Sequence, residues 1–155
     1  MQQLNKELFD WKDPALIVNS LVETWGENGL IWLDGDGSDL GRWITIGIDP
    51  IDQICCHGLF SKDTSSDPFY ALRNLSYGHW TGWISYEAAS WLEPSMKCKS
   101  DPMATLWMGS HDPILKLDLQ KKELWIEGND YARIQKLKNV LQTIPEEVNK
   151  RKLEK

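Results

Sequence analysis

The spacing of apolar and polar positions along the chain predicts three helices and several short strands. Apolar residues recur at helical intervals after Asp13-Pro14 and after Asn129, and both sites carry residues that favour the start of a helix. Gly26 and Pro145 are expected to end these two helices, and Asp67-Pro68 begins a shorter one. Runs of aromatic and β-branched residues predict strands at 29–33, 43–48, 53–57, 80–86, 103–110, 114–119 and 123–127.

The stretch 78–94 has the highest density of large apolar side chains, with the sequence GHWTGWISYEAASWLEP. Its first part, 80–86, is rich in aromatic and β-branched residues, so we expect a strand that is buried on both faces. Glu87 opens a segment of short-helix character, which Pro94 ends. The pattern therefore makes this stretch the centre of the predicted core.

The order and length of the predicted elements indicate the fold class. Segments 114–119 and 123–127 alternate apolar with polar residues around a short turn, which is typical of a half-buried hairpin. The strand at 53–57 follows 43–48 closely enough to be its partner. We therefore predict an α+β fold with mainly antiparallel β-sheets and flanking helices.

Length and charge narrow the picture further. The chain has 155 residues and a net charge of −6, and it lacks a basic face, which argues against nucleic acid as a partner. No apolar run approaches the ~20 residues that span a membrane, and the charged N-terminal segment favours the cytoplasm. We expect one domain over residues 1–145, followed by a charged tail or linker over 146–155.

Nine tryptophans and three cysteines are the notable features of the composition. Most of the tryptophans are expected in the core, because large aromatic side chains dominate core burial. Cys55, Cys56 and Cys98 lack the spacing of a metal site or redox motif, so we expect buried reduced thiols.

No catalytic or metal-binding constellation stands out in the pattern. The three histidines, His57, His79 and His111, lie far apart without ligand spacing. Acidic residues crowd the loop 34–39, but the calcium-loop pattern requires a glutamate where the chain has Trp43, so a turn is favoured. The sequence alone predicts no catalytic residue and no metal ligand.

Four stretches nevertheless occur in the order found in one enzyme family. They are GLIWLD at 29–34, GRWITIGIDP at 41–50, DPF at 67–69 followed by GWISYE at 82–87, and DPMA at 101–104 followed by Trp107, Asp112 and Asp118. In this register the chain resembles the N-terminal domain of component I of the chorismate-utilising synthases, which comprise anthranilate synthase and aminodeoxychorismate (para-aminobenzoate) synthase. The resemblance covers nearly the whole chain.

The resemblance implies a part of an enzyme without an active site of its own. In the family, a C-terminal domain holds the chorismate pocket, the magnesium-binding carboxylates and the catalytic base. This chain is therefore expected to be inactive alone and to hold no cofactor, with magnesium in the absent catalytic domain. The partners that the resemblance implies are the C-terminal chorismate-binding domain and, as a further possibility, a glutamine amidotransferase subunit.

The family's N-terminal domain can also bind tryptophan between its sheets. The residues here that match this pocket are Leu33, Asp34, Gly35, Arg42 and Trp43. Feedback-sensitive anthranilate synthases carry Glu-Ser where this chain has Asp34-Gly35, so the ligand would lose a serine hydroxyl. This difference favours the aminodeoxychorismate branch, in para-aminobenzoate and folate biosynthesis.

Two alternative functions, and two roles for Arg42, remain open from the sequence. The chain can instead belong to anthranilate synthase component I, in tryptophan biosynthesis, or it can be a stand-alone tryptophan-rich binding module. Within the predicted pocket, Arg42 either pairs with Asp34 or Asp39 across the turn or supports a bound amino acid.

Overall fold

The computed structural model describes residues 5–145, and they form two compact units. The first unit contains the residues up to Asp49 and those from Asp112 onwards, and the second contains Pro50–His111. Each unit is built on its own antiparallel sheet. The predicted α+β class is therefore confirmed at this level. The predicted tail at 146–155 lies outside the described residues, and the folding of 1–145 as one domain stays a prediction.

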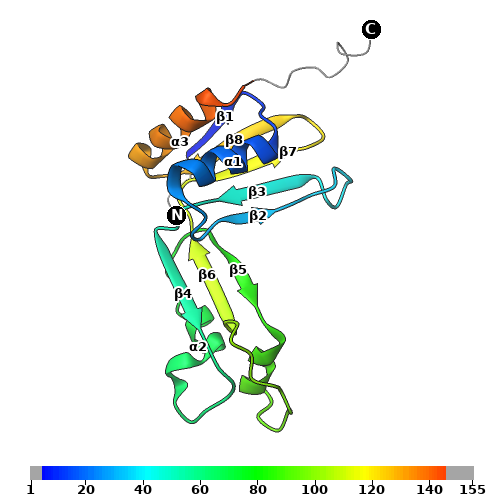
Figure 1. Cartoon of the computed structure of the whole chain (residues 1–155), viewed down its shortest axis with the longest axis vertical. Helices are drawn as coiled ribbons and strands as arrows, with labels where there is room; N and C mark the ends of the chain where they lie inside the picture. The colour runs from blue at the N-terminus through cyan, green and yellow to red at the C-terminus, as the bar shows by residue number, and fades with distance from the viewer. Residues whose placement is uncertain (1–4, 146–155) are drawn as a thin grey trace. The chain divides into compact units, whose positions relative to one another are not determined.

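The first unit consists of a five-stranded antiparallel sheet and two helices (Figure 1). The strand order is β1-β8-β7-β3-β2, so strands from both ends of the sequence meet in one sheet. Its elements are β1 (Asn5–Phe9), α1 (Pro14–Trp25), β2 (Ile31–Leu33), β3 (Trp43–Gly47), β7 (Ile114–Asp118), β8 (Glu123–Gly128) and α3 (Tyr131–Thr143).

The second unit is a three-stranded antiparallel sheet with short helical segments. The strand order is β4-β6-β5, which makes β6 the only strand of this sheet that is paired on both sides. Its elements are β4 (Asp52–Cys56), η1 (Thr64–Ser66), α2 (Pro68–Arg73), β5 (Trp80–Ile84), η2 (Tyr86–Trp91) and β6 (Leu106–Ser110).

Aspartate caps begin the three α-helices. The carboxylate of Asp13 accepts hydrogen bonds from the backbone N–H of Ala15 and Leu16, and Asp67 caps α2 in the same way. The prediction of Asn129 as the cap of the last helix is wrong by one residue. Asp130 holds that position, because its carboxylate accepts from the N–H of Arg133 at 3.1 Å.

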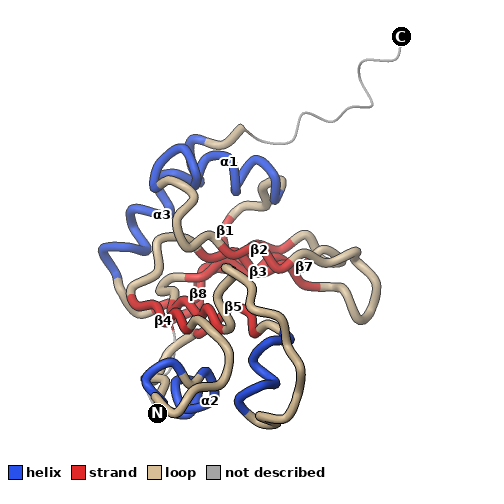
Figure 2. Tube along the Cα trace, turned by 60° about the horizontal axis from the view of Figure 1, so that its bottom comes forward, coloured by secondary structure: helices blue, strands red, loops and turns tan. Residues whose placement is uncertain are grey.

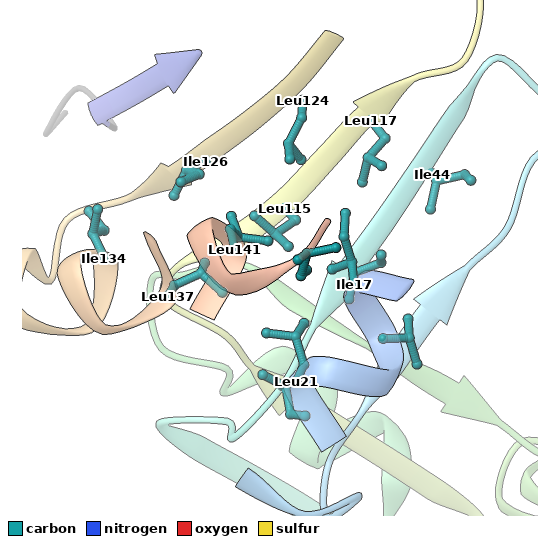
Figure 3. Close-up of a cluster of buried hydrophobic side chains, with 14 residues drawn as sticks. Ile17, Leu21, Ile44, Leu115, Leu117, Leu124, Ile126, Ile134, Leu137 and Leu141 are labelled. Atoms are coloured by element: carbon teal, nitrogen blue, oxygen red, sulfur yellow. The ribbon is translucent and has the colours of Figure 1, made fainter. Parts of the chain in front are cut away.

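The core of the first unit lies between its sheet and its two helices. Figure 2 shows α1 and α3 on the same side of the sheet, and Figure 3 shows aliphatic side chains from both meeting those of β3, β7 and β8. The stripe predicted on the last helix is confirmed as part of this core. The cluster consists of Ile17, Val18, Leu21, Ile44, Ile46, Ile48, Leu115, Leu117, Leu124, Ile126, Ile134, Leu137, Leu141 and Ile144.

The expectation of a tryptophan-rich core is wrong. None of the nine tryptophans, all of which the structure describes, is fully buried, and the core is aliphatic instead. Four indoles in the first unit lie under a basic side chain, with the cation 4.4–5.3 Å from the ring centre. These indoles are stabilised at the border of the core, because a cation above the face of an aromatic ring is attracted to the ring. The four pairs are Trp11 with Lys122, Trp25 with Lys136, Trp43 with Arg42, and Trp125 with Lys6.

Strand partners account for the other differences from the predicted pattern. The segment at 53–57 forms β4 but pairs with β6, while β3 lies between β2 and β7. The segment at 80–86 forms β5, an edge strand whose Trp83 and Ile84 are exposed, so it is not buried on both faces. The pattern of a short segment predicts that it forms a strand. It does not predict the strand with which it pairs, because pairing depends on contacts between residues far apart in the sequence. The polar segment of β1 gave no strand signal and was not predicted.

Candidate functional site

The five residues of the predicted pocket lie at the β2–β3 end of the first unit. Leu33 ends β2, Asp34 and Gly35 begin the loop 34–42, and Arg42 precedes Trp43, the first residue of β3. Leu33 pairs with Thr45 in the register of the two strands. Thr45 and Trp43 share a face of β3, and it is the face opposite Ile44 and Ile46, which point to the helices.

Leu33 and Trp43 therefore share the helix-free face of the sheet. Their side chains are 51% and 44% exposed, so an apolar group has room to contact both of them. The guanidinium carbon of Arg42 lies 5.3 Å from the centre of the Trp43 ring. The structure thus brings together an exposed aliphatic side chain, an exposed indole and a cation, which suit an amphipathic ligand.

Arg42 pairs with Asp118, which is contributed by β7. The Arg42 Nε donates to Asp118 Oδ1 at 2.9 Å, and Nη2 donates to Oδ2, so the contact is bidentate. The predicted alternative of pairing with Asp34 or Asp39 across the turn is wrong. Asp118 stands directly opposite Trp43 in the sheet register and is fully buried, which makes it the closer and better shielded partner.

Asp118 also organises the turn between β7 and β8. Its Oδ1 accepts from the backbone N–H of Gln120 at 3.0 Å and of Lys121 at 3.1 Å. The hydrogen bonds from Arg42 lower the pKa of Asp118 from its ordinary value of 3.8 to about 2, and the two backbone N–H groups act in the same direction against burial. One buried carboxylate thus joins the start of β3 to the β7–β8 turn.

The loop 34–42 is closed by its own hydrogen bonds and by the same turn. The N–H of Gly37 donates to the carbonyl of Gly41 at 2.9 Å, and the N–H of Gly41 donates to Ser38 Oγ at 3.0 Å. The amide of Gln120 donates to the carbonyl of Gly37 at 3.3 Å and to Asp39 at 3.2 Å. The acidic loop is therefore a closed turn seated on the hairpin.

Gly35 is required by close backbone packing within this loop. A Cβ at this position would overlap the carbonyl oxygen of Gly41 and would lie 2.7 Å from that of Trp43. Both obstacles are backbone atoms, so the loop would have to shift to admit any side chain. In this loop conformation, glycine cannot be exchanged for serine without rearrangement.

Asp34 makes a local contact only, since its carboxylate accepts from the N–H of Gly35 at 3.0 Å. The Nη1 of Arg42 makes no hydrogen bond to the part of the chain described here, 5–145. Arg42 therefore keeps donors for a carboxylate while it is anchored by Asp118. Ligand binding at the five residues of the predicted pocket stays a prediction.

The helix-free face of the same sheet carries a second ionic cluster. Glu127 of β8 lies 3.0 Å from the ammonium of Lys6 and 3.2 Å from that of Lys116. Burial raises the pKa of Glu127, but the hydrogen bonds from the two lysines outweigh it and hold the pKa below its ordinary value. This face of the sheet therefore carries charged side chains on β1, β8 and β7, and exposed apolar side chains at Leu33 of β2 and Trp43 of β3.

A separate cavity of about 60 Å³ lies beside the start of α3. Arg133 forms part of its lining, with Nε donating to the carbonyl of Asp112 at 2.7 Å and Nη1 to Asp49 at 3.1 Å. Trp25, under the ammonium of Lys136, forms part of the lining. Sequence reasoning missed this arginine clamp, because its two partners, Asp49 and Asp112, lie far from Arg133 and from each other in the chain.

The cysteines differ from their prediction in one case. Cys56 is buried as expected, and burial raises the pKa of its thiol. Cys98 is partly buried, and Cys55 is exposed. The expectation of buried thiols is therefore wrong for Cys55, which lies on the opposite face of β4 from Cys56 because side chains alternate along a strand.

The described residues contain neither a metal-ligand cluster nor a membrane-spanning helix. Over 5–145, no group of three His, Cys, Asp or Glu side chains is arranged to hold a metal ion. None of the helices in that range is long and apolar enough to cross a membrane.

Comparison with known proteins adds no assignment. A scan against protein-family models finds no match, and a search of curated proteins finds no significant match either. Functional inference therefore depends on the motifs and on the geometry described above.

Proposed function

We propose that the chain is the N-terminal, non-catalytic domain of component I of a chorismate-utilising synthase, of the aminodeoxychorismate branch. In this role it supports a C-terminal chorismate-binding domain that supplies magnesium and the catalytic base. The proposal begins from the four motifs in register at 29–34, 41–50, 67–87 and 101–118. The α+β architecture with two antiparallel sheets is compatible with it.

The single observation that carries the proposal is the surface of the second unit. Apart from Pro68, it buries only four apolar residues, three of them small, whereas ten large ones are exposed. We take this imbalance as support for packing against a further domain, since a region that buries few large apolar side chains by itself can cover them at an interface. The exposed residues are Ile51, Phe60, Tyr70, Tyr77, Trp83, Ile84, Tyr86, Leu92, Met96 and Met103.

Two features of the predicted pocket support the aminodeoxychorismate branch over anthranilate synthase. Gly35 has no space for the serine side chain that feedback-sensitive anthranilate synthases use. Arg42 is already neutralised by Asp118, so the site does not need a ligand to satisfy its charge. Both features favour a structural pocket over a feedback site.

Binding to a separately produced catalytic domain tests the domain assignment. The chain is mixed with the chorismate-binding domain of an aminodeoxychorismate synthase component I, and the mixture is analysed by sedimentation. We expect a one-to-one complex that is weakened when Trp83 and Tyr86 are both changed to serine. Leu40, which is fully exposed on the loop of the other unit, provides the control change to serine. Failure of the wild-type chain to bind would contradict the assignment.

Calorimetry with free tryptophan tests the branch. For the aminodeoxychorismate branch we expect no feedback by tryptophan on the complex and no binding of tryptophan in the micromolar range. Micromolar binding that Arg42→Ala weakens about tenfold, a change of ~1.4 kcal/mol, would instead favour anthranilate synthase.

A tryptophan-rich binding module is the second candidate, and the exposed indoles favour it. Trp32, Trp43 and Trp83 are each about two-fifths exposed. Stacking of such indoles on sugar rings would shift tryptophan emission when oligosaccharides are added. We expect no shift for a synthase domain, and a saturable shift would support the module.

A further inference from the structure

We propose that Cys55 is a thiol-modification site that forms mixed disulfides with small disulfides, with His57 as the base that removes the thiol proton. This inference is independent of the proposed function and concerns the second unit alone. It rests on the contact between the two side chains and on the surface around them.

Cys55 and His57 are both exposed and lie in contact with each other. The Cys55 Sγ is 3.2 Å from His57 Nε2, within hydrogen-bond distance for sulfur. Cys55 belongs to β4, and His57 follows two positions later, after the end of the strand. Side chains two positions apart in an extended chain point to the same side, so the backbone itself places the base beside the thiol.

The strand that carries Cys55 also leaves it accessible. β4 is an edge strand of its sheet, and its neighbour β6 contributes Trp107 directly opposite Cys55. Trp83 of β5 stands opposite Trp107 in turn, so the three residues form one row across a single face. The row presents an aromatic surface next to the thiol.

His57 is the titratable group that the fold brings to this thiol. The neighbouring positions on the same face of β6 and β5 carry no charge, since they are Trp107, Gly109, Trp83 and Thr81. An imidazole in hydrogen-bond contact is a suitable acceptor for the proton of a thiol, and the thiolate is the nucleophilic form of cysteine.

The reaction is a thiol–disulfide exchange that balances without a further oxidant. The proton of Cys55 moves from Sγ to His57 Nε2, and the thiolate attacks one sulfur of a small disulfide. The new S–S bond forms as the S–S bond of the reagent breaks, and the leaving thiolate takes the proton from His57. Cys55 is oxidised and one half of the small disulfide is reduced to a thiol.

The three cysteines allow the test to be made within one molecule. The reduced chain is treated near pH 7 with oxidised glutathione or with an aromatic disulfide that releases a coloured thiolate. Peptide mass spectrometry then gives the rate at each cysteine. We expect Cys55 to react at least about tenfold faster than Cys98, while Cys56 stays unmodified because it is buried. Modification of Cys98 at the rate of Cys55 would overturn the proposal.

A histidine variant tests the role of His57. We expect His57→Gln to slow the reaction of Cys55 about tenfold near pH 7, and His79→Gln, the matched control, to leave the rate unchanged. At about pH 10 thiols ionise without a base, so the rates of the variant and the wild type should converge. An unchanged rate near pH 7, or a deficit that persists at high pH, would overturn the role of His57. Cys56 reports folding, since a variant that unfolds would expose it to the reagent.

Discussion

At the scale of single residues, the described structure is organised by charged side chains that lie at the border of the core. Asp118 is the clearest case, because it is fully buried and joins the loop before β3 to the β7–β8 turn through three donors: Arg42, Gln120 and Lys121. A buried carboxylate is tolerated only when its charge and its lone pairs are satisfied.

Removal of either member of the Arg42–Asp118 pair should destabilise the first unit. Arg42→Met leaves a buried carboxylate without its cation, and Asp118→Asn removes the charge that anchors Arg42. We expect each to lower the Tm by about 5 °C or more, measured by circular dichroism. Asp39→Asn is the control. Asp39 is exposed, and the amide oxygen of asparagine can still accept the hydrogen bond from Gln120, so the Tm should shift by about 1 °C at most.

The acid dependence of stability should carry the signature of Asp118. Its pKa is about 2 in the folded chain against an ordinary value of 3.8. Its contribution to the free energy of unfolding is therefore fully present above pH 3.8 and is lost as the pH falls through about 2. Urea unfolding of wild type and Asp118→Asn should show a stability difference that shrinks over this interval. A constant difference would contradict the shifted pKa.

The contacts between individual side chains are the features of the structure that the sequence predicts least well. Arg42 was recognised as a cation needing a partner, but its partner lies 76 positions away. A local pattern offered only carboxylates of the same loop, and Asp34 and Asp39 were chosen from these. The same limit hid the contacts of Arg133 with Asp49 and Asp112. The Cys55–His57 contact was not predicted. The two residues are only two positions apart, but that spacing becomes informative only once both are known to be exposed.

At the scale of elements, the sequence predicted well those features that depend on neighbouring residues. Helix caps depend on a few neighbouring residues, and Asp13 and Asp67 were found from sequence for that reason. The partners of strands depend on contacts across the chain, so β4 was assigned to the wrong neighbour and the polar β1 was missed. The edge position of β5 was hidden by its composition, which resembles that of a central strand.

The cap of α3 offers a test of the one-residue correction. Asp130→Ala removes the acceptor for the N–H of Arg133, and we expect it to lower the free energy of unfolding by about 1 kcal/mol. Asn129→Ala is the matched control, because its side chain does not cap the helix, and it should cost only a few tenths of that. Equal losses in chemical denaturation would restore Asn129 as part of the cap.

At the scale of the whole molecule, the two units differ in how much apolar surface they bury. The first unit holds a cluster of fourteen buried aliphatic residues, whereas the apolar residues that the second unit buries are Cys56, Pro68, Ala88, Ala104 and Leu106. Composition cannot reveal this difference, since aromatic residues are frequent in both units. We therefore expect the second unit to be the less stable of the two in the free chain, and the proposed catalytic domain to stabilise it.

Native-state hydrogen exchange should resolve the two units. We expect the amides of β3, β7 and β8 to exchange by global unfolding, and those of β4, β5 and β6 to exchange at a lower free energy by local opening. Addition of a catalytic domain that covers the second unit should slow the latter group selectively. Uniform protection across both sheets in the free chain would show that 1–145 unfolds as one cooperative domain.

The most direct test of the central claim is a rate measurement on chorismate. A chorismate-binding catalytic domain of an aminodeoxychorismate synthase component I, made without its own N-terminal domain, is assayed with ammonia and magnesium in the presence and absence of this chain. We predict no aminodeoxychorismate from the chain alone and a saturable increase in rate when the chain is added to the catalytic domain. Turnover by the chain alone, or no effect on the catalytic domain at any concentration of the chain, would contradict the account.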